Sequence, residues 1–410
     1  MLPSTSDARR RIRSLEKLPT KSLLCLGKTQ RPSTTTSLRH GQSNADAADR
    51  RQLPGYTKLK KLGVGGCGTV WQVQAVETSA RFALKQIPKH ASGLVSGFVE
   101  VKVGLRLFPQ ADVVRVKLLE RSSAAATQPS GDNNRPPHII QLYKVVETKQ
   151  DLWLLFEQGG ETLHNALFDI KGEFHQGSRS YKITHRPLYL AMRDNVSLLK
   201  DLLRQLVQAV ATLSAVGIVH ADIKPDNILI GQAARADHSL QLMVKLIDFG
   251  SAFSASSPRL SSARTPEYVP PDILELVRTK HEPCDVKAYF ASHCLPHSFD
   301  MWSVGCVFLE IVCGVPLWFS YKSRVTGWDP NRSVTGLLSA SGRDPDKIAH
   351  RQLHVVEHLT KCIRDSPGMN VDSKRWLYGV DLLERMLSIN PSQRIAPDEA
   401  LRHPFLHQSD

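Results

Sequence analysis

The sequence lacks three features that would place it in a membrane or in an oxidising compartment. Its seven cysteines include no C-x-x-C pair and form no regular framework, so we expect reduced thiols and an intracellular setting, cytoplasmic or nuclear. The N-terminus has no apolar core of about 7–15 residues, which a secretory signal would need. The longest apolar stretch, Ser303 to Phe319, contains Glu310 and Pro316. It is shorter than the roughly 20 residues of a membrane span, which predicts a buried core helix.

Acidic residues are scarce at the start of the chain. The first 51 residues hold eleven Lys and Arg but four Asp and Glu, within a chain of net charge +14. Residues 1–52 also lack hydrophobic periodicity, which predicts a basic, disordered tail. Such a tail attracts acidic partners, but it has no interleaved aromatic residues, so nucleic acid is not an expected partner. Its arginine- and serine-rich start leaves an organelle transit peptide as an alternative.

From residue 55 to residue 407 the pattern is that of one large α+β domain with two lobes. The first lobe, about 55–158, contains short β-like runs and one helical segment. They lie at Tyr56–Leu62, Val70–Val76, Arg81–Ile87, Val95–Phe108 (helix), Ile139–Glu147 and Leu152–Glu157. After Gly159 apolar residues recur with helical spacing, so we expect the second lobe, about 159–407, to be mainly helical.

A glycine-rich string between the first two β-like runs fits G-x-G-x-x-G-x-V, with Gly63, Gly65, Gly66, Gly68 and Val70 at its defined positions. Glycine allows close approach of the backbone to a phosphate, but a plain hairpin turn explains this string equally well on its own.

The next run includes Ala83 and Lys85. A lone lysine on a strand is normally a solvated charge, whereas a lysine placed to contact phosphates is usually held by a carboxylate on a nearby helix. Glu100 is the preferred partner and Glu120 the alternative.

Two further strings settle the interpretation. Residues 220–227 read HADIKPDN, which resembles the catalytic loop H-R-D-x-x-x-x-N of protein kinases except at Ala221. Asp248-Phe249-Gly250 follows 21 positions after Asn227. With the glycine string and Lys85 upstream, the chain resembles the eukaryotic protein kinase superfamily over about residues 55–407.

This resemblance implies ATP and Mg²⁺ as cofactors and a role for each matching residue. Asp222 would accept the proton of the substrate hydroxyl, and Lys224 would neutralise the transferred phosphoryl group. Asn227 and Asp248 would hold Mg²⁺, and Lys85 would contact the α- and β-phosphates. The other ATP-binding positions implied are the glycine string with Val70, Ala83, Glu100, the gatekeeper Phe156, and the hinge from Glu157 to Gly159. Asp300 would brace the catalytic loop.

Serine and threonine are the expected phosphate acceptors, because Lys224-Pro225 is the form of the loop found in serine/threonine kinases. In similar kinases a threonine at the place of Thr265 also bonds the catalytic aspartate and lysine. Residues 300–310 (DMWSVGCVFLE) and the long segment 320–378 resemble the group that contains cyclin-dependent and MAP kinases. Residues 265–272 do not match that group, which indicates a divergent member.

Several departures from the family carry expectations of their own. Ala221 replaces the arginine that pairs with an activation-loop phosphate, so activity should not depend on phosphorylation read there. Asp272 replaces a glutamate, so its ion pair with Arg394 should be longer or shifted.

Two insertions also depart from the family. One contains His281-x-x-Cys284 and Cys294-x-x-His297, whose spacing allows a zinc site, although scattered residues in a surface insertion are the commoner case. The other, Phe168–Arg186, reads as a solvated basic loop, with selection of acidic substrates or docking of a partner as its alternatives.

The sequence therefore predicts a serine/threonine kinase acting on protein substrates, of the type without the catalytic-loop arginine. The alternative is a pseudokinase or nucleotide-binding scaffold. A regulatory protein that seats Glu100 on Lys85 is a further possible partner.

Overall fold

The computed structural model describes residues 50–66, 68–115, 136–175, 178–234, 240–260, 265–278, 283–329, 333–338, 345–373 and 375–407. Nearly all of the predicted basic tail, 1–52, lies outside these ranges. The chain forms two compact units: Met1–Gly131 with Gln141–Gln158, and Asp132–Ile140 with Gly159–Asp410. A β-rich first part followed by a helical second part confirms the predicted α+β class.

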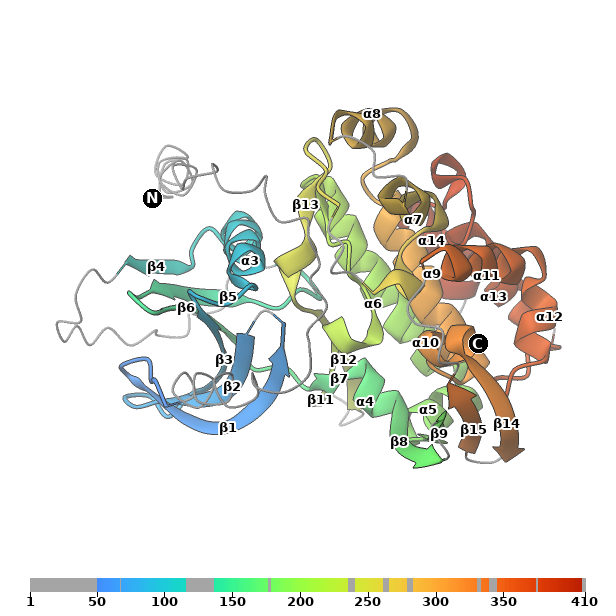
Figure 1. Ribbon diagram of the computed structural model, residues 1–410, viewed down its shortest axis with the longest axis horizontal. Coiled ribbons are helices and arrows are strands. Elements are labelled where there is room, and N and C mark those ends of the chain that lie inside the picture. The colour runs from blue at the N-terminus through green and yellow to red at the C-terminus, as the bar shows by residue number, and fades with distance from the viewer. Residues whose placement is uncertain are drawn as a thin grey trace. The chain divides into compact units, whose positions relative to one another are not determined.

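The first unit is built on a six-stranded sheet in the order β1-β2-β3-β6-β5-β4 (Figure 1). Its strands are β1 (Tyr56–Gly65), β2 (Gly68–Ala75), β3 (Arg81–Pro88), β4 (Asp112–Arg115), β5 (Leu142–Glu147) and β6 (Asp151–Glu157). All neighbours pair antiparallel except β4, which lies parallel to β5. The sequence pattern did not predict β4, because four residues are too few to show alternation.

Alternation along β3 places apolar side chains on the core face of the sheet and Lys85 on the opposite face. Phe82 and Leu84 are buried in a hydrophobic cluster with Val73 and Leu155. Because successive strand residues point to opposite faces, Ala83 and Lys85 lie on the other side. Helix α3 (Leu94–Leu107) contacts β3, β5 and β6.

The second unit is mainly helical and has the long helix α9 at its centre. α9 (Ser298–Cys313) is buried along its whole length, which confirms the core helix predicted from the apolar stretch. α6 (Val196–Ala215) packs against it. The remaining helices are α4 (Leu163–Leu167), α5 (Pro187–Asp194), α7 (Pro271–Arg278), α8 (Pro283–His293), α10 (Leu317–Lys322), α11 (Pro345–Glu357), α12 (Leu359–Arg364), α13 (Arg375–Met386), α14 (Pro397–Arg402) and α15 (Pro404–His407).

Two small sheets complete the parts of this unit that position the catalytic loop. β11 (Ile228–Ala234) and β12 (Leu240–Leu246) form the predicted hairpin, and β7 (Glu161–Thr162) pairs with β11. β10 (Ile218–Val219) pairs with β13 (Phe253–Ser254). The predicted catalytic loop, residues 220–227, follows β10 and ends where β11 begins, so strands hold both of its ends.

A four-stranded sheet replaces the basic loop expected at Phe168–Arg186. β8 (Phe168–His175) and β9 (Ser178–His185) form a hairpin. β9 also pairs with β15 (Ser333–Leu338), which pairs with β14 (Ser323–Asp329). The expectation was wrong because the partner strands lie about 150 residues further along the chain, and β9 buries Ile183 and His185.

Among the described residues, no helix has both the length and the apolar composition to cross a bilayer.

Candidate functional site

The ammonium of Lys85, on β3, forms a buried ion pair with the carboxylate of Glu100, on α3. Lys85 Nζ lies 2.7 Å from Glu100 Oε2, and the two residues are 7% and 3% exposed. A charged group at such burial is tolerated only with a partner. The structure thus pairs Lys85 with the preferred candidate. The alternative, Glu120, lies outside the described residues.

Strand register places further predicted ATP-binding residues on the same face of the sheet as Lys85. Val70 is the cross-strand partner of Lys85, and Phe156 is the partner of Ala83. Directly paired residues point to the same side, so these four side chains share one face. They come from β2, β3 and β6, and only the sheet brings them together.

The glycines of the predicted phosphate loop differ in what the fold requires of them. At Gly68 (φ +138°) an added Cβ would lie 2.2 Å from the carbonyl oxygen of Gln86, so the fold itself needs glycine there. At Gly63, Gly65 and Gly66 an added Cβ would meet nothing within 4 Å. Packing within the unit therefore does not explain these three glycines, whereas close approach of a phosphate would.

The predicted hinge begins at Glu157, the last residue of β6. Its Oε1 accepts the backbone N–H of Gln141 at 2.9 Å, and its own N–H donates to the Gln141 carbonyl at 3.0 Å. This carboxylate thus braces the end of its own sheet. Gly159 begins the second unit, where an added Cβ would lie 2.2 Å from Leu229 Cδ1. A side chain at this position would therefore have to displace the end of the Leu229 side chain on β11.

The Asp300 carboxylate holds the backbone of the predicted catalytic loop through two hydrogen bonds, as the resemblance implied. Its Oδ2 accepts the N–H of His220 at 2.7 Å, and its Oδ1 accepts the N–H of Ala221 at 2.9 Å. Ala221 is buried and adopts a left-handed backbone conformation, with φ at +65°. Two hydrogen bonds to one buried carboxylate stabilise this conformation, which is unfavourable for a residue other than glycine.

Asp222, Lys224, Asn227 and Thr265 form one connected cluster in the second unit. Lys224 Nζ lies 2.9 Å from Asp222 Oδ2 and 2.7 Å from Thr265 Oγ1. Asn227 Nδ2 donates to the same carboxylate oxygen at 2.9 Å and to the Asp222 carbonyl at 2.8 Å. These bonds fix the orientation of the Asp222 carboxylate, which is partly exposed.

The oxygen atoms near this cluster suit a hard divalent cation. The Asn227 amide nitrogen donates its hydrogen bonds to Asp222, so the amide oxygen Oδ1 points away from Asp222 and can coordinate a metal ion. Asp248 supplies a carboxylate from a left-handed residue (φ +62°), directly before the turn η2 (Phe249–Ser251). Carboxylate and amide oxygens are the ligands that Mg²⁺ prefers. The donor set therefore fits the predicted ion.

Asp272 reaches Arg394 directly, so the expected lengthening of their ion pair is wrong. Arg394 Nη2 lies 2.5 Å from Asp272 Oδ1, and Tyr289 OH donates to the other carboxylate oxygen at 2.9 Å. The aspartate side chain reaches the Arg394 guanidinium although it is shorter than glutamate, because Asp272 lies at the start of α7 close to that group.

For the insertion that ends before α9, the sequence left a zinc site as the alternative to scattered histidines and cysteines, and the structure describes the side chains of Cys294 and His297. Neither Cys294 nor His297 belongs to a cluster of three metal-binding groups in the described part of the chain. His281 and the side chain of Cys284 lie outside that part, so the site stays a prediction.

Two features of α11 escaped sequence reasoning. Gln352, on α11, is 1% exposed, and its amide donates to the Val269 carbonyl at 2.9 Å and the Glu267 carbonyl at 3.3 Å. It thus holds the segment that follows Thr265. The same helix ends in an exposed group formed by His354, Glu357 and His358. The string H-x-x-E-H would have signalled this group.

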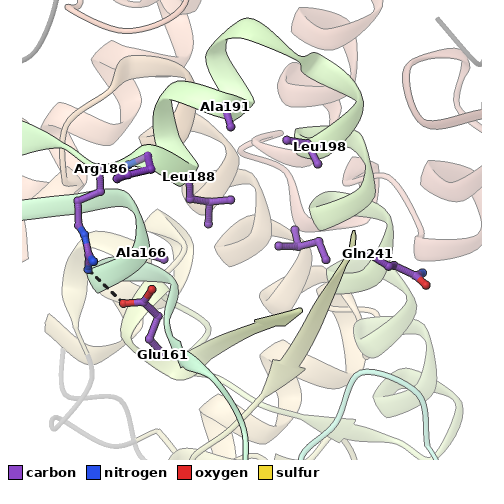
Figure 2. A pocket seen from close by; sticks show the side chains of 9 residues that line it. Glu161, Ala166, Arg186, Leu188, Ala191, Leu198 and Gln241 are labelled. Atoms are coloured by element: carbon purple, nitrogen blue, oxygen red, sulfur yellow. Dashed lines mark hydrogen bonds and ion pairs between the residues drawn. The ribbon is translucent and has the colours of Figure 1, made fainter. Parts of the chain in front are cut away.

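A separate cavity of about 430 Å³ lies among α4, α5, α6 and β12 (Figure 2). An exposed ion pair stands at its edge, with Arg186 Nη1 3.1 Å from Glu161 Oε2. Leu188, Leu198 and Leu242 supply apolar lining. None of the predicted catalytic side chains lines this cavity, so it is distinct from the catalytic cluster.

Comparison with known proteins gives a consistent result. The family described as protein kinase domain matches residues 131–406. Protein kinase gsk3 of Schizosaccharomyces pombe is 26% identical, covering 86% of this chain and 74% of that protein. Mitogen-activated protein kinase HOG1 of Phaeosphaeria nodorum is 28% identical, covering 86% and 79%. Extracellular signal-regulated kinase 2 of Dictyostelium discoideum is 26% identical, covering 89% and 83%.

Proposed function

The chain belongs to the protein kinase family, as an ATP-dependent serine/threonine kinase of the group that contains cyclin-dependent and MAP kinases, and we propose that it is catalytically active through Asp222, Lys224, Asn227, Asp248 and Lys85. Its substrates are proteins. The alternative, a pseudokinase that only binds nucleotide, would not need the catalytic side chains that this chain keeps.

The observation that carries the proposal is the orientation of the Asp222 carboxylate. Its Oδ2 receives hydrogen bonds from both Lys224 and Asn227, each at 2.9 Å. A carboxylate held in this way can accept the proton of a substrate hydroxyl while that oxygen forms a bond to the γ-phosphorus. The bond from the γ-phosphorus to ADP breaks in the same transfer, and the Lys224 ammonium neutralises charge on the phosphoryl oxygens.

Asn227 and Asp248 would hold Mg²⁺, which when bound neutralises charge on the phosphate oxygens of ATP. Lys85, held by Glu100, binds the α- and β-phosphates. Thr265 accepts a hydrogen bond from Lys224 and so limits its motion. Catalysis by this chain is thus positioning and electrostatic stabilisation, without a covalent protein intermediate.

Phosphate transfer by matched variants tests the proposal. The full chain, Asp222→Asn, Asp248→Asn and the control Asp194→Asn are incubated with radiolabelled ATP, Mg²⁺ and a Ser/Thr/Tyr peptide library. We expect transfer to Ser and Thr peptides by wild type and control, and a loss of roughly 100-fold or more in the other two. ATP binding without transfer in the wild type would instead favour the nucleotide-binding scaffold.

Regulation should reflect the missing arginine at Ala221. A buried methyl group has no donor for a phosphate on the activation segment. We propose that phosphatase treatment, or joint replacement of Ser256, Ser257, Ser261 and Ser262 by alanine, leaves the transfer rate within about twofold. A loss of activity after both treatments would contradict this regulation without contradicting kinase activity itself.

A further inference from the structure

The exposed group at the end of α11 has the composition of a metal site. It consists of His354, Glu357 and His358, whose ligand atoms all lie within 4.8 Å of one another. The spacing places the three side chains at positions i, i+3 and i+4, which meet on one face of a helix. The two imidazole rings converge, with centroids 4.7 Å apart and planes inclined at 68°.

The backbone keeps this helical relationship across a break in the helix. α11 ends at Glu357 and α12 begins at Leu359, so His358 is the residue between them, with φ −125° and ψ 33°. Its N–H still donates to the His354 carbonyl at 3.1 Å. Its own carbonyl accepts the N–H of Cys362 at 2.9 Å. The three side chains therefore lie at the junction of two helices, two on the last turn of α11 and one on the residue that precedes α12.

The donor set and the distances suit zinc. Two imidazoles and a carboxylate are common zinc ligands, and water can supply the fourth. Ligand atoms around a tetrahedral zinc ion are about 3.4 Å apart, given metal–ligand bonds of about 2.0–2.1 Å. Exposed side chains can close the remaining separation by small rotations. In one class of metalloenzymes the two histidines of the same H-x-x-E-H spacing bind zinc.

We propose that His354, Glu357 and His358 bind one Zn²⁺ ion at the junction between α11 and α12. All three side chains are exposed, so an ion from solution can reach them directly. α11 also carries Gln352, whose amide bonds to the carbonyls of Glu267 and Val269 from the opposite, buried side. An ion at the end of α11 would thus stabilise the helix that supports the segment after Thr265.

Zinc binding to the full chain tests the proposal independently of kinase activity. Wild type, His354→Ala/His358→Ala and the control His90→Ala/His407→Ala, which removes two exposed histidines elsewhere, are dialysed against Zn²⁺. We expect the first double variant to bind one ion fewer per chain than wild type and control. Zn²⁺ should also raise the Tm of wild type and control more than that of the first double variant.

Equal stoichiometry in all three proteins would overturn the proposal. Absorption spectra of the Co²⁺-loaded proteins identify the ligands. The wild type should show a ligand-field band that His354→Ala/His358→Ala lacks, and this band should come without thiolate-to-cobalt charge transfer. Thiolate charge transfer in that band would contradict the His–Glu–His ligand set. Because the changed positions are exposed, we expect the metal-free variants to unfold at the same temperature as wild type.

Discussion

Arg394 and Asp272, 122 positions apart in the sequence, form an ion pair of 2.5 Å. The Arg394 side chain is fully buried and that of Asp272 is 13% exposed. The guanidinium also donates to the carbonyls of Ser388 at 2.8 Å and Ser298 at 3.2 Å. One buried cation thus connects the start of α7, the start of α9 and the chain before α14.

Removing the carboxylate should destabilise the protein strongly. We expect Asp272→Ala to lower the free energy of unfolding by about 3–5 kcal/mol, because it leaves Arg394 buried without a counter-charge. Asp272→Glu should cost less, since it keeps the charge. The matched control is Arg385→Ala, which breaks the exposed pairs with Asp381 and Glu399 and should cost about 1 kcal/mol or less. Urea unfolding measures all three, and equal effects of Asp272→Ala and the control would contradict the expectation.

The Lys85–Glu100 pair should behave as a unit in catalysis. Glu100→Gln keeps the size of the side chain but removes the charge that holds the Lys85 ammonium, so we expect kcat/KM to fall roughly 10- to 100-fold. Lys85→Met should reduce it further, because it also removes the phosphate contact. The double variant should be no worse than Lys85→Met alone, since Glu100 acts through the lysine. Additive losses would show that Glu100 has a separate role.

Thr265 should matter through its hydroxyl and not through its methyl group. Its Oγ1 accepts a hydrogen bond of 2.7 Å from Lys224, and a bond to a charged group is worth about 1.5–3 kcal/mol. We therefore expect Thr265→Ala to lower kcat roughly 10- to 100-fold and Thr265→Ser to remain near wild type. Steady-state rates on one Ser peptide decide this. A similar loss in both variants would assign the effect to packing.

The buried carboxyl of Glu310 should make stability depend on pH. Burial raises its pKa from 4.5 to about 8, although Tyr268 and the Leu317 N–H both donate to its Oε2. The folded state then binds more protons than the unfolded state, so stability should fall as pH rises from about 5 to about 8 and level off above. Glu310→Gln cannot ionise and should flatten this dependence. Tm values measured across this range in both proteins would test it, and parallel curves would contradict it.

The catalytic strings were recognisable from the sequence because each is short and contiguous. Asp222, Lys224 and Asn227 lie within six positions, so their relationship hardly depends on the rest of the fold. Their connection to Thr265, 41 positions away from Lys224, was expected from the resemblance, and the structure shows it as a direct bond. The family assignment from these strings is confirmed by the match over residues 131–406.

Where the sequence misled, the deciding contact came from far along the chain. Phe168–Arg186 was expected to be a basic loop, because the alternation within this segment was too weak to indicate strands. Its strand β9 pairs with β15, which lies far along the chain and could not be inferred from the segment itself. The Asp272–Arg394 distance was misjudged because side-chain length was considered without the position of α7. Gln352 escaped notice because a single glutamine carries no motif, and its importance lies in the carbonyls it meets.

The sequence by itself determined the kinase family and the α+β class and predicted the catalytic side chains, because local strings and apolar periodicity carry this information. Tertiary structure alone decided that Glu100 neutralises Lys85, that Asp272 closes directly on Arg394 and that Phe168–Arg186 shares one sheet with β14 and β15. These relationships depend on burial and on the distance between residues that are remote in the chain, and a short buried ion pair forms only where packing brings both charges out of water together.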